Sequence, residues 1–137
     1  MTSKVPIKFR GKWVGDMIAG ATADKWEYGC LAFGDGYYYI LSPTSPAVGW
    51  FSQERVSPET IGQYTGLKDK DGVEIYEGDV LGGLLGDGVV VWVAAEARFG
   101  ISLGGEIHEV YFNELTQNEL EVIGNIHDSP ELLEATP

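Results

Sequence analysis

Apolar and polar residues alternate over several short stretches of this chain, and a period of two predicts β-strands. The first such stretch covers residues 7–14, where Ile7, Phe9 and Trp13 alternate with Lys8, Arg10 and Lys12. We therefore expect a strand with one buried apolar face and one exposed basic face. Charged residues along an exposed strand also guard its edge against aggregation. This structural role is favoured over a basic ligand site.

An aromatic-rich hairpin is predicted next. Residues 26–33 and 37–41 each have the composition of a strand, and Gly34-Asp35-Gly36 between them has the composition of a tight turn. Residues 42–46 contain two prolines, which remove donors from a ladder and favour extended neighbours, so a connector is expected there. Trp50 and Phe51 are the next large apolar residues after this connector.

The centre of the chain, residues 56–80, contains two closely spaced turns. Strands are predicted at residues 63–66 and 73–76, joined by a charged loop that ends in Asp71-Gly72. The Asp-Gly pair tolerates the positive φ of a tight hairpin, and Glu77-Gly78 has similar turn chemistry. A third strand is expected to start at Asp79.

The remaining pattern predicts more short strands and a short terminal helix. Residues 89–94 form the most hydrophobic run, residues 98–103 and 106–112 can pair across Gly104-Gly105, and residues 119–126 alternate again. Pro130 and Glu131 after Asp128 and Ser129 favour one or two helical turns. We therefore predict an all-β chain with an N-terminal β-hairpin segment at residues 1–55. Residues 56–137 are expected to form a small closed or nearly closed antiparallel barrel with the helix at its end.

The charge of the chain argues against general nucleic-acid binding. The net charge is −12, and four of the nine basic residues fall within the first twelve positions. The other 125 residues therefore carry five basic and twenty-one acidic residues, a charge of 5 − 21 = −16. Binding to nucleic acid depends on Lys and Arg at phosphates, so nucleic acid is an improbable partner.

The composition also indicates the cellular compartment of the protein. No apolar run is long enough to span a membrane, and the first residues lack the apolar core of an export signal. The single cysteine, Cys30, permits no internal disulfide. We expect a cytoplasmic protein in which Cys30 is a buried structural thiol within its apolar strand.

The acidic residues of the central stretch suggest a calcium site. A calcium loop of the EF-hand type needs glycine at its sixth position, but Gly72 is fourth when counting starts at Asp69. We therefore expect these acids to accept hydrogen bonds within turns. The residues concerned are Asp69, Asp71, Glu74, Glu77 and Asp79.

No metal, cofactor or catalytic site is predicted elsewhere. His108 and His127 lack the spacing of a zinc site, and Glu106 beside His108 adds only one further candidate ligand. Nucleophile and phosphate-binding motifs are absent. We expect no enzymatic activity. A hydrolase using Asp71 or Asp79 is the least favoured alternative.

The aromatic residues of the N-terminal segment are the leading candidates for a binding surface. Aromatic side chains are enriched in subunit interfaces, and they also stack on the bases of single-stranded nucleic acid. The predicted interface residues are Phe9, Trp13, Trp26, Tyr28, Tyr37, Tyr39 and Trp50. The nucleic-acid alternative would add contacts from Lys8, Arg10 and Lys12.

Five blocks of sequence resemble the YopX protein family. They are IKFR at residues 7–10, PETIGQYTGLKD at residues 58–69, IYEGDV at residues 75–80 after Gly72, LEVIGNI at residues 120–126 and PELL at residues 130–133. The resemblance implies a phage or prophage protein with an SH3-like barrel in its C-terminal part, which forms a homo-oligomer. It brings no established activity and no catalytic residues. The chain departs from the family pattern at residues 15–24 and 42–50.

The sequence therefore predicts a non-enzymatic phage or prophage protein that acts as a homo-oligomeric interaction or assembly module. The alternative is a regulator that contacts nucleic acid, or a host enzyme of nucleic-acid metabolism, through its basic N-terminal strand. Other copies of the chain are the expected partners, with a host or phage protein as a further possibility.

Overall fold

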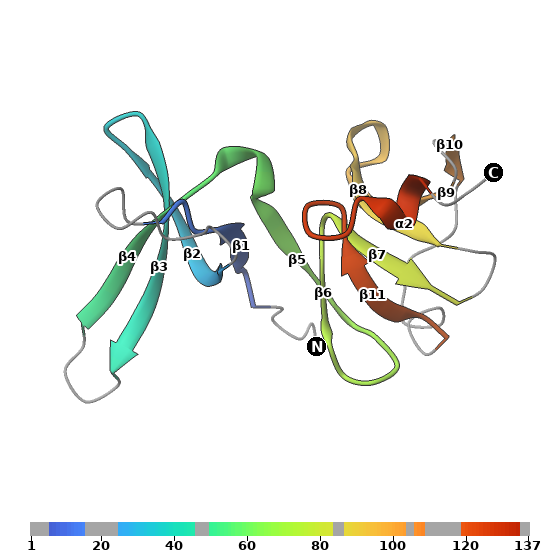
Figure 1. Cartoon of the computed structure of the whole chain (residues 1–137), viewed down its shortest axis with the longest axis horizontal. Coiled ribbons are helices and arrows are strands. Elements are labelled where there is room, and N and C mark those ends of the chain that lie inside the picture. The colour runs from blue at the N-terminus through green and yellow to red at the C-terminus, as the bar shows by residue number, and fades with distance from the viewer. Residues whose placement is uncertain are drawn as a thin grey trace. The chain divides into compact units, whose positions relative to one another are not determined.

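The computed structural model describes residues 6–15, 25–45, 50–83, 87–103, 106–108 and 119–134. Strands dominate these residues, so the all-β class predicted from the sequence is confirmed (Figure 1). The strands are β1 (Phe9–Lys12), β2 (Trp26–Gly34), β3 (Tyr37–Ser45), β4 (Trp50–Val56), β5 (Gly62–Lys68), β6 (Glu74–Tyr76), β7 (Asp79–Gly82), β8 (Gly88–Val93), β9 (Arg98–Leu103), β10 (Glu106–His108) and β11 (Glu121–Asn125). The helical segments are η1 (Pro58–Thr60), η2 (Ala94–Glu96) and α2 (Glu131–Glu134).

The chain divides into two compact units, unit 1 from Met1 to Gln63 and unit 2 from Tyr64 to Pro137. Within β5, the first two residues belong to unit 1 and pair with β1, through Gly62 to Arg10 and Gln63 to Phe9. The predicted change of domain after residue 55 stays a prediction. Within the described chain no helix is long and apolar enough to cross a membrane.

Unit 1 is an antiparallel sheet in which β1 to β4 lie in the order β4-β3-β2-β1. The strand β2 changes partner along its length: Trp26 to Gly29 pair with β1, and Cys30 to Gly34 pair with β3. At the predicted turn, Asp35 and Gly36 have φ values of 53° and 86°, and two successive positive φ values are typical of a tight hairpin. The strand β4 was not predicted, because residues 42–46 were expected to form a connector rather than part of β3.

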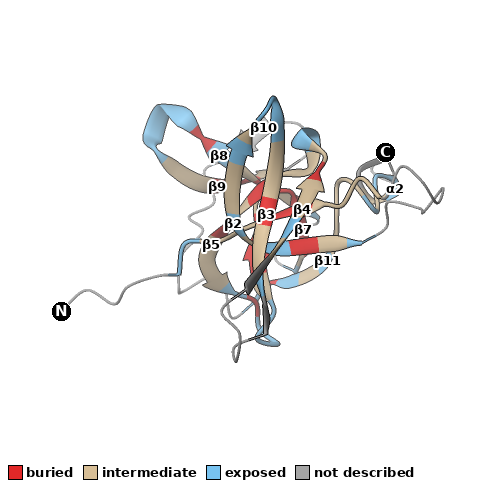
Figure 2. Ribbon diagram, turned by 90° about the vertical axis from the view of Figure 1, so that its left-hand side faces the viewer, coloured by how far each residue is buried: buried red, intermediate tan, exposed pale blue. Residues whose placement is uncertain are grey.

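The sheet of unit 1 curls until the end of β1 meets the end of β4. Trp13 forms a bridge to Val56, the Val14 N–H donates to the Arg55 carbonyl at 3.1 Å, and the Ser57 N–H donates to the Lys12 carbonyl at 2.9 Å. The curl encloses Ile40 and Val56, which are almost completely buried. In Figure 2 such buried residues lie within the strands, and many exposed residues lie at turns.

Gly11 allows this close approach, because a Cβ at that position would lie 2.8 Å from the Val56 Cβ. Replacing Gly11 with alanine is expected to lower the free energy of unfolding by about 2 kcal/mol, since a methyl group forced into a packed core costs about 1–3 kcal/mol. Gly34→Ala is the matched control, since a Cβ on Gly34 in β2 would meet nothing within 4 Å. Urea denaturation of both variants tests the prediction, and equal stabilities would contradict it.

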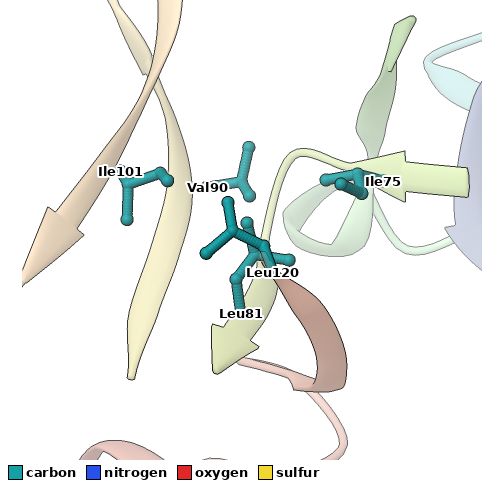
Figure 3. Close-up of a cluster of buried hydrophobic side chains, with 5 residues drawn as sticks. All are labelled: Ile75, Leu81, Val90, Ile101 and Leu120. Carbon is teal, nitrogen blue, oxygen red and sulfur yellow. The ribbon is translucent and has the colours of Figure 1, made fainter. Parts of the chain in front are cut away.

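Unit 2 contains the β5–β6 pairing and a five-stranded antiparallel sheet in the order β10-β9-β8-β7-β11. Its apolar core contains one residue each from β6, β7, β8 and β9, together with Leu120, which precedes β11 (Figure 3). The core residues are Ile75, Leu81, Val90, Ile101 and Leu120, with Phe99 and Val122 packed against them. The predicted core role of residues 89–94 is confirmed for Val90 and Val93, whereas Trp92 is exposed.

The predicted closed barrel is not seen in unit 2. The strands β10 and β11 are the two edges of its sheet, and the described residues show no pairing between them. Alternating residues reveal that strands exist, but closure depends on strand tilt and stagger, which a residue pattern does not determine. The turn α2 lies after Pro130.

Candidate interaction surface

Unit 1 places basic side chains directly over aromatic rings. In the β1–β2 ladder, Lys12 lies opposite Trp26 and Arg10 lies opposite Tyr28. Both cations reach the Trp26 ring: the Arg10 Cζ lies 4.7 Å from the ring centroid and the Lys12 Nζ lies 5.9 Å from it. Such pairs are attractive because a cation interacts with the negative face of the ring. The basic residues of β1 thus pack against an aromatic side chain of the same sheet.

A second cation–aromatic pair lies beside the first. The Lys25 Nζ is 5.7 Å from the centroid of the Trp13 ring and 3.0 Å from the Glu27 carboxylate. Hydrogen bonding to Glu27, with its negative charge, raises the pKa of Lys25 above its ordinary value. Lys25 therefore stays protonated, and it neutralises the buried Glu27.

The tip of the β2–β3 hairpin carries aromatic side chains on both faces of the sheet. Phe33 and Tyr38 lie opposite each other on one face, and Tyr37 lies on the other face beside Arg55 of β4. The Phe33 and Tyr38 rings are 4.8 Å apart, and the Arg55 Cζ lies 3.6 Å from the Tyr37 centroid. Phe33 remains 65% exposed and Tyr37 43% exposed. On each face of the hairpin tip, one exposed aromatic ring is therefore held by one contact.

The predicted interface residues fall into two groups. Tyr28 and Tyr37 are exposed, as an interface requires, whereas the others with described side chains are only partly exposed. The partly exposed residues are Phe9, Trp13, Trp26 and Tyr39. Trp50 begins β4, but its side chain lies outside the described ones. Sequence reasoning missed Phe33 and Arg55, although the position of Phe33 next to a two-residue turn marked it as a hairpin-tip residue.

Two predictions about exposure are wrong. The Arg10 side chain was expected on a wet basic face, but it is buried, with 5% exposure, because it lies against Trp26. Ile7, expected on the buried face, is 76% exposed because it precedes the first paired residue of β1. Lys8 and Lys12 are partly exposed. The predicted nucleic-acid contacts therefore include one residue whose guanidinium is largely withdrawn from solvent.

Cys30 also differs from its prediction. It was expected to be a buried thiol, but it is a free, exposed cysteine. Cys30 is the residue at which β2 leaves β1 and begins to pair with β3, opposite Leu41. The aromatic neighbours that suggested burial are themselves exposed or partly exposed.

Two of the five acidic residues of the central stretch, Asp69 and Asp79, accept backbone hydrogen bonds as expected. The Asp69 carboxylate accepts from the N–H groups of Asp71, Val73 and Val122 at 2.8, 2.9 and 2.9 Å. The buried Asp79 carboxylate accepts from the Tyr76 N–H at 2.7 Å. Among described residues, no group of three His, Cys, Asp or Glu side chains could hold a metal ion.

Of the two histidines, His127 lies in the turn that follows β11 and His108 lies in β10. His127 donates its backbone N–H to the Asn125 side chain at 3.0 Å, in the turn that follows β11. The side chains of Glu106 and His108 in β10 lie outside the described ones.

The negative charge of the chain resides in unit 2. Residues 1–63 contain six basic and six acidic residues and are therefore neutral. Residues 64–137 contain three basic and fifteen acidic residues, so their charge is 3 − 15 = −12. The exposed aromatic surface of unit 1 thus belongs to a neutral unit, and the other unit is strongly acidic.

Comparison with known proteins gives a family match and a similar solved structure. Residues 40–134 match the family described as YopX protein. Among solved structures, the crystal structure of protein EF1440 from Enterococcus faecalis is similar, with a TM-score of 0.53 and 27% sequence identity over 95% of this chain and 99% of that chain. No curated protein matches.

Proposed function

The chain belongs to the YopX protein family, and on this premise we propose that it is a non-enzymatic phage or prophage protein that assembles with copies of itself. In this proposal the protein works in the cytoplasm of a bacterial host cell, and its C-terminal unit is a variant of the SH3-like barrel. Unit 1 supplies the surface for assembly.

One observation carries this proposal: unit 1 leaves large aromatic side chains exposed on an ordered framework. Tyr28, Phe33 and Tyr37 are 48%, 65% and 43% exposed, and the last two are held by contacts with Tyr38 and Arg55. Aromatic residues and arginine are enriched where proteins bind one another. An exposed group of this composition supports a role in protein association.

A catalytic role is not supported by the central stretch. Of the two carboxylates named for a hydrolase, Asp79 is buried and accepts the Tyr76 backbone N–H, whereas Asp71 is exposed. Asp79 therefore has the arrangement of a carboxylate that stabilises a turn, which leaves Asp71 of the two facing solvent. We therefore include the absence of enzymatic activity in the proposal.

The burial of Arg10 argues against the nucleic-acid alternative. Arg10 is buried against Trp26, which leaves Lys8 and Lys12 as the partly exposed cations of β1. Affinity for a phosphate backbone grows with the number of cations that reach it. We therefore favour a protein partner over nucleic acid for this surface.

The proposal predicts that the purified protein is an oligomer in solution. Light scattering during size exclusion is expected to give a single mass several times the 14.9 kDa of the chain. That mass should persist on tenfold dilution, because an oligomer stays assembled at concentrations above its dissociation constant. A mass of one chain at all concentrations would reject the assembly function.

A further inference from the structure

The sheet of unit 1 has two faces, which the strand register assigns. Directly opposed residues of paired strands point to the same face, and side chains alternate between the two faces along each strand. Gly11, Ile40 and Val56 lie on the face that the curl of the sheet encloses. We call the opposite face the outer face and define it by alternate residues of four strands. They are Arg10 and Lys12 of β1, Trp26, Tyr28, Cys30 and Ala32 of β2, Tyr37, Tyr39 and Leu41 of β3, and Gln53 and Arg55 of β4.

The charged residues of strands β1 to β4 are divided between these two faces. The cations all lie on the outer face, and they are Arg10, Lys12 and Arg55. The two acids of these strands lie on the enclosed face, where Glu27 is opposite Gly11 and Glu54 is opposite Ile40. Unit 1 is neutral as a whole, but within these four strands its outer face carries three cations and no acid.

The outer face is also aromatic and accessible. Tyr28 and Tyr37 are 48% and 43% exposed, and Cys30 and Gln53 are exposed as well. The Arg55 Cζ lies 3.6 Å from the centroid of the Tyr37 ring. A guanidinium held in this way can still donate from its edge to a carboxylate. Aromatic rings together with arginine are typical of the centre of a protein interface.

We infer that the outer face of unit 1 binds the acidic unit 2 of a second copy of the chain, and this inference rests on the proposed assembly function. The outer face is cationic, whereas unit 2 carries three basic and fifteen acidic residues, a charge of −12. Complementary charges favour encounter between the right surfaces and suppress wrong pairings. Two outer faces would not bind each other, because their cations repel.

Single-stranded nucleic acid fits the outer face less well. Its bases could stack on the tyrosines, but Arg10 is only 5% exposed, so Lys12 and Arg55 are the partly exposed cations of the face. Affinity for a phosphate backbone grows with the number of cations that reach it. An acidic protein surface needs fewer charge pairs, since the aromatic rings supply much of the contact area.

The assembly should therefore weaken as salt is added. The contact joins two different surfaces, so copies would associate head to tail, in a closed ring or a filament. Salt screens the attraction between partly exposed charges. Raising the NaCl concentration from about 50 mM to about 500 mM is expected to raise the dissociation constant, measured by light scattering, by about 10-fold or more.

Two matched pairs of full-length variants test the outer face. Tyr28 and Phe33 are both exposed aromatic residues of β2, but Phe33 lies on the other face, opposite Tyr38. Tyr28→Ser is expected to raise the dissociation constant by about 10-fold or more, and Phe33→Ser by less than about threefold. Arg55→Glu should weaken assembly by about 30-fold. Lys68→Glu makes the same change of charge at an exposed residue outside the face and should not weaken it.

A further variant tests the acidic partner surface. It neutralises five exposed acids of unit 2 and changes the charge of that unit from −12 to −12 + 5 = −7. The changes are Asp71→Asn, Asp87→Asn, Glu119→Gln, Glu121→Gln and Glu131→Gln. This variant and Arg55→Glu should each assemble poorly alone, but equal amounts should form pairs, because one keeps its outer face and the other keeps its acids. Circular dichroism establishes that every variant is folded.

Four results would overturn the inference. If the two variants of either matched pair weaken assembly equally, the outer face is not the contact, although the assembly function survives. If the neutralised variant keeps the wild-type mass and salt response, the outer face binds a surface other than the acids of unit 2. If nuclease treatment dissociates the wild-type particle, nucleic acid is the occupant. If the wild-type protein is a monomer at every salt concentration, the proposed function fails together with the inference.

Discussion

Replacing Asp69 with alanine is expected to lower the free energy of unfolding by about 4 kcal/mol. The buried carboxylate accepts three backbone N–H groups, from Asp71, Val73 and Val122. Hydrogen bonds to a charged group contribute about 1.5–3 kcal/mol each, and each buried donor left without an acceptor costs about 1–3 kcal/mol. Water entering the site will restore some of these bonds, which is why the expected loss is below the full sum.

The location of Asp69 explains why one side chain has so large an effect. Its Oδ1 closes the turn that leads into β6, and its Oδ2 binds the Val122 N–H of β11, 53 residues further along the chain. Its neighbour Lys70 donates its backbone N–H to the Leu120 carbonyl at 3.0 Å. Asp69 therefore connects a local turn to the last strand of unit 2, next to the core residue Leu120.

Asp69 should also make stability depend on pH in the acidic range. Burial raises the pKa of the Asp69 carboxyl, but the backbone hydrogen bonds from Val122, Val73 and Asp71 outweigh burial, and its pKa is lowered from 3.8. A lowered pKa in the folded state contributes stability that is complete above the unfolded-state pKa. That stability is lost as the pH falls through the folded-state value. The difference in stability between wild type and Asp69→Asn should therefore shrink below about pH 4.

Urea denaturation at pH 7 and at a series of lower pH values measures both effects. Asp71→Ala is the control, because Asp71 is an exposed acid of the same loop whose pairing with Lys70, at 3.9 Å, is that of a weak surface ion pair. We expect Asp71→Ala to change the unfolding free energy by less than about 1 kcal/mol. Equal losses for Asp69→Ala and Asp71→Ala would show that the three hydrogen bonds do not carry the stability assigned to them.

The hairpins of this protein could be predicted from sequence because their turns depend on local chemistry. Gly36, Gly72 and Gly78 have φ values of 86°, 84° and 93°, and the sequence predicts a turn at each of them. A residue with positive φ requires glycine or a small polar residue, so the sequence itself records the turn. Once these turns are placed, the strands on either side of them can be predicted from their residues.

Side-chain surroundings were harder to predict than strands. A period of two separates the faces of β1, but it does not reveal that Trp26 on the neighbouring strand would cover Arg10. Long cationic side chains can lie along apolar or aromatic surface, and a polarity pattern counts them as exposed. The pattern also did not reveal that Cys30 is exposed, because its aromatic neighbours suggested a core.

The candidate surface was predicted in part. Tyr28 and Tyr37 were named from the aromatic content of their strands, and both are exposed. Arg55 was missed because it comes from β4, which the prolines of residues 42–46 concealed. Pairing of Tyr39 with Arg55 brings the guanidinium to the β3 rings. This contact depends on strand register, which a single sequence with no predicted β4 could not supply.

Gly29→Ala is expected to lower the free energy of unfolding by about 4 kcal/mol, and its effect should be confined to unit 1. At Gly29 the strand β2 leaves β1 and begins to pair with β3. Its φ is +155°, and a Cβ there would lie 2.2 Å from the Leu41 carbonyl oxygen, a backbone atom that cannot move aside alone. A strained backbone costs about 1–3 kcal/mol, and forcing a methyl group into occupied space costs about 1–3 kcal/mol more.

Gly36→Ala separates these two contributions. Gly36 has a φ of +86°, but a Cβ there would meet nothing within 4 Å, so this variant should lose only the conformational part, about 1 kcal/mol. Tryptophan fluorescence during urea denaturation reports mainly on unit 1, which contains Trp13, Trp26 and Trp50 of the four tryptophans. Hydrogen exchange then shows whether the core of unit 2 keeps its protection. If Gly29→Ala costs no more than Gly36→Ala, Leu41 does not pass as close to Gly29 as described, and the switch of β2 between its two partners must have a different geometry.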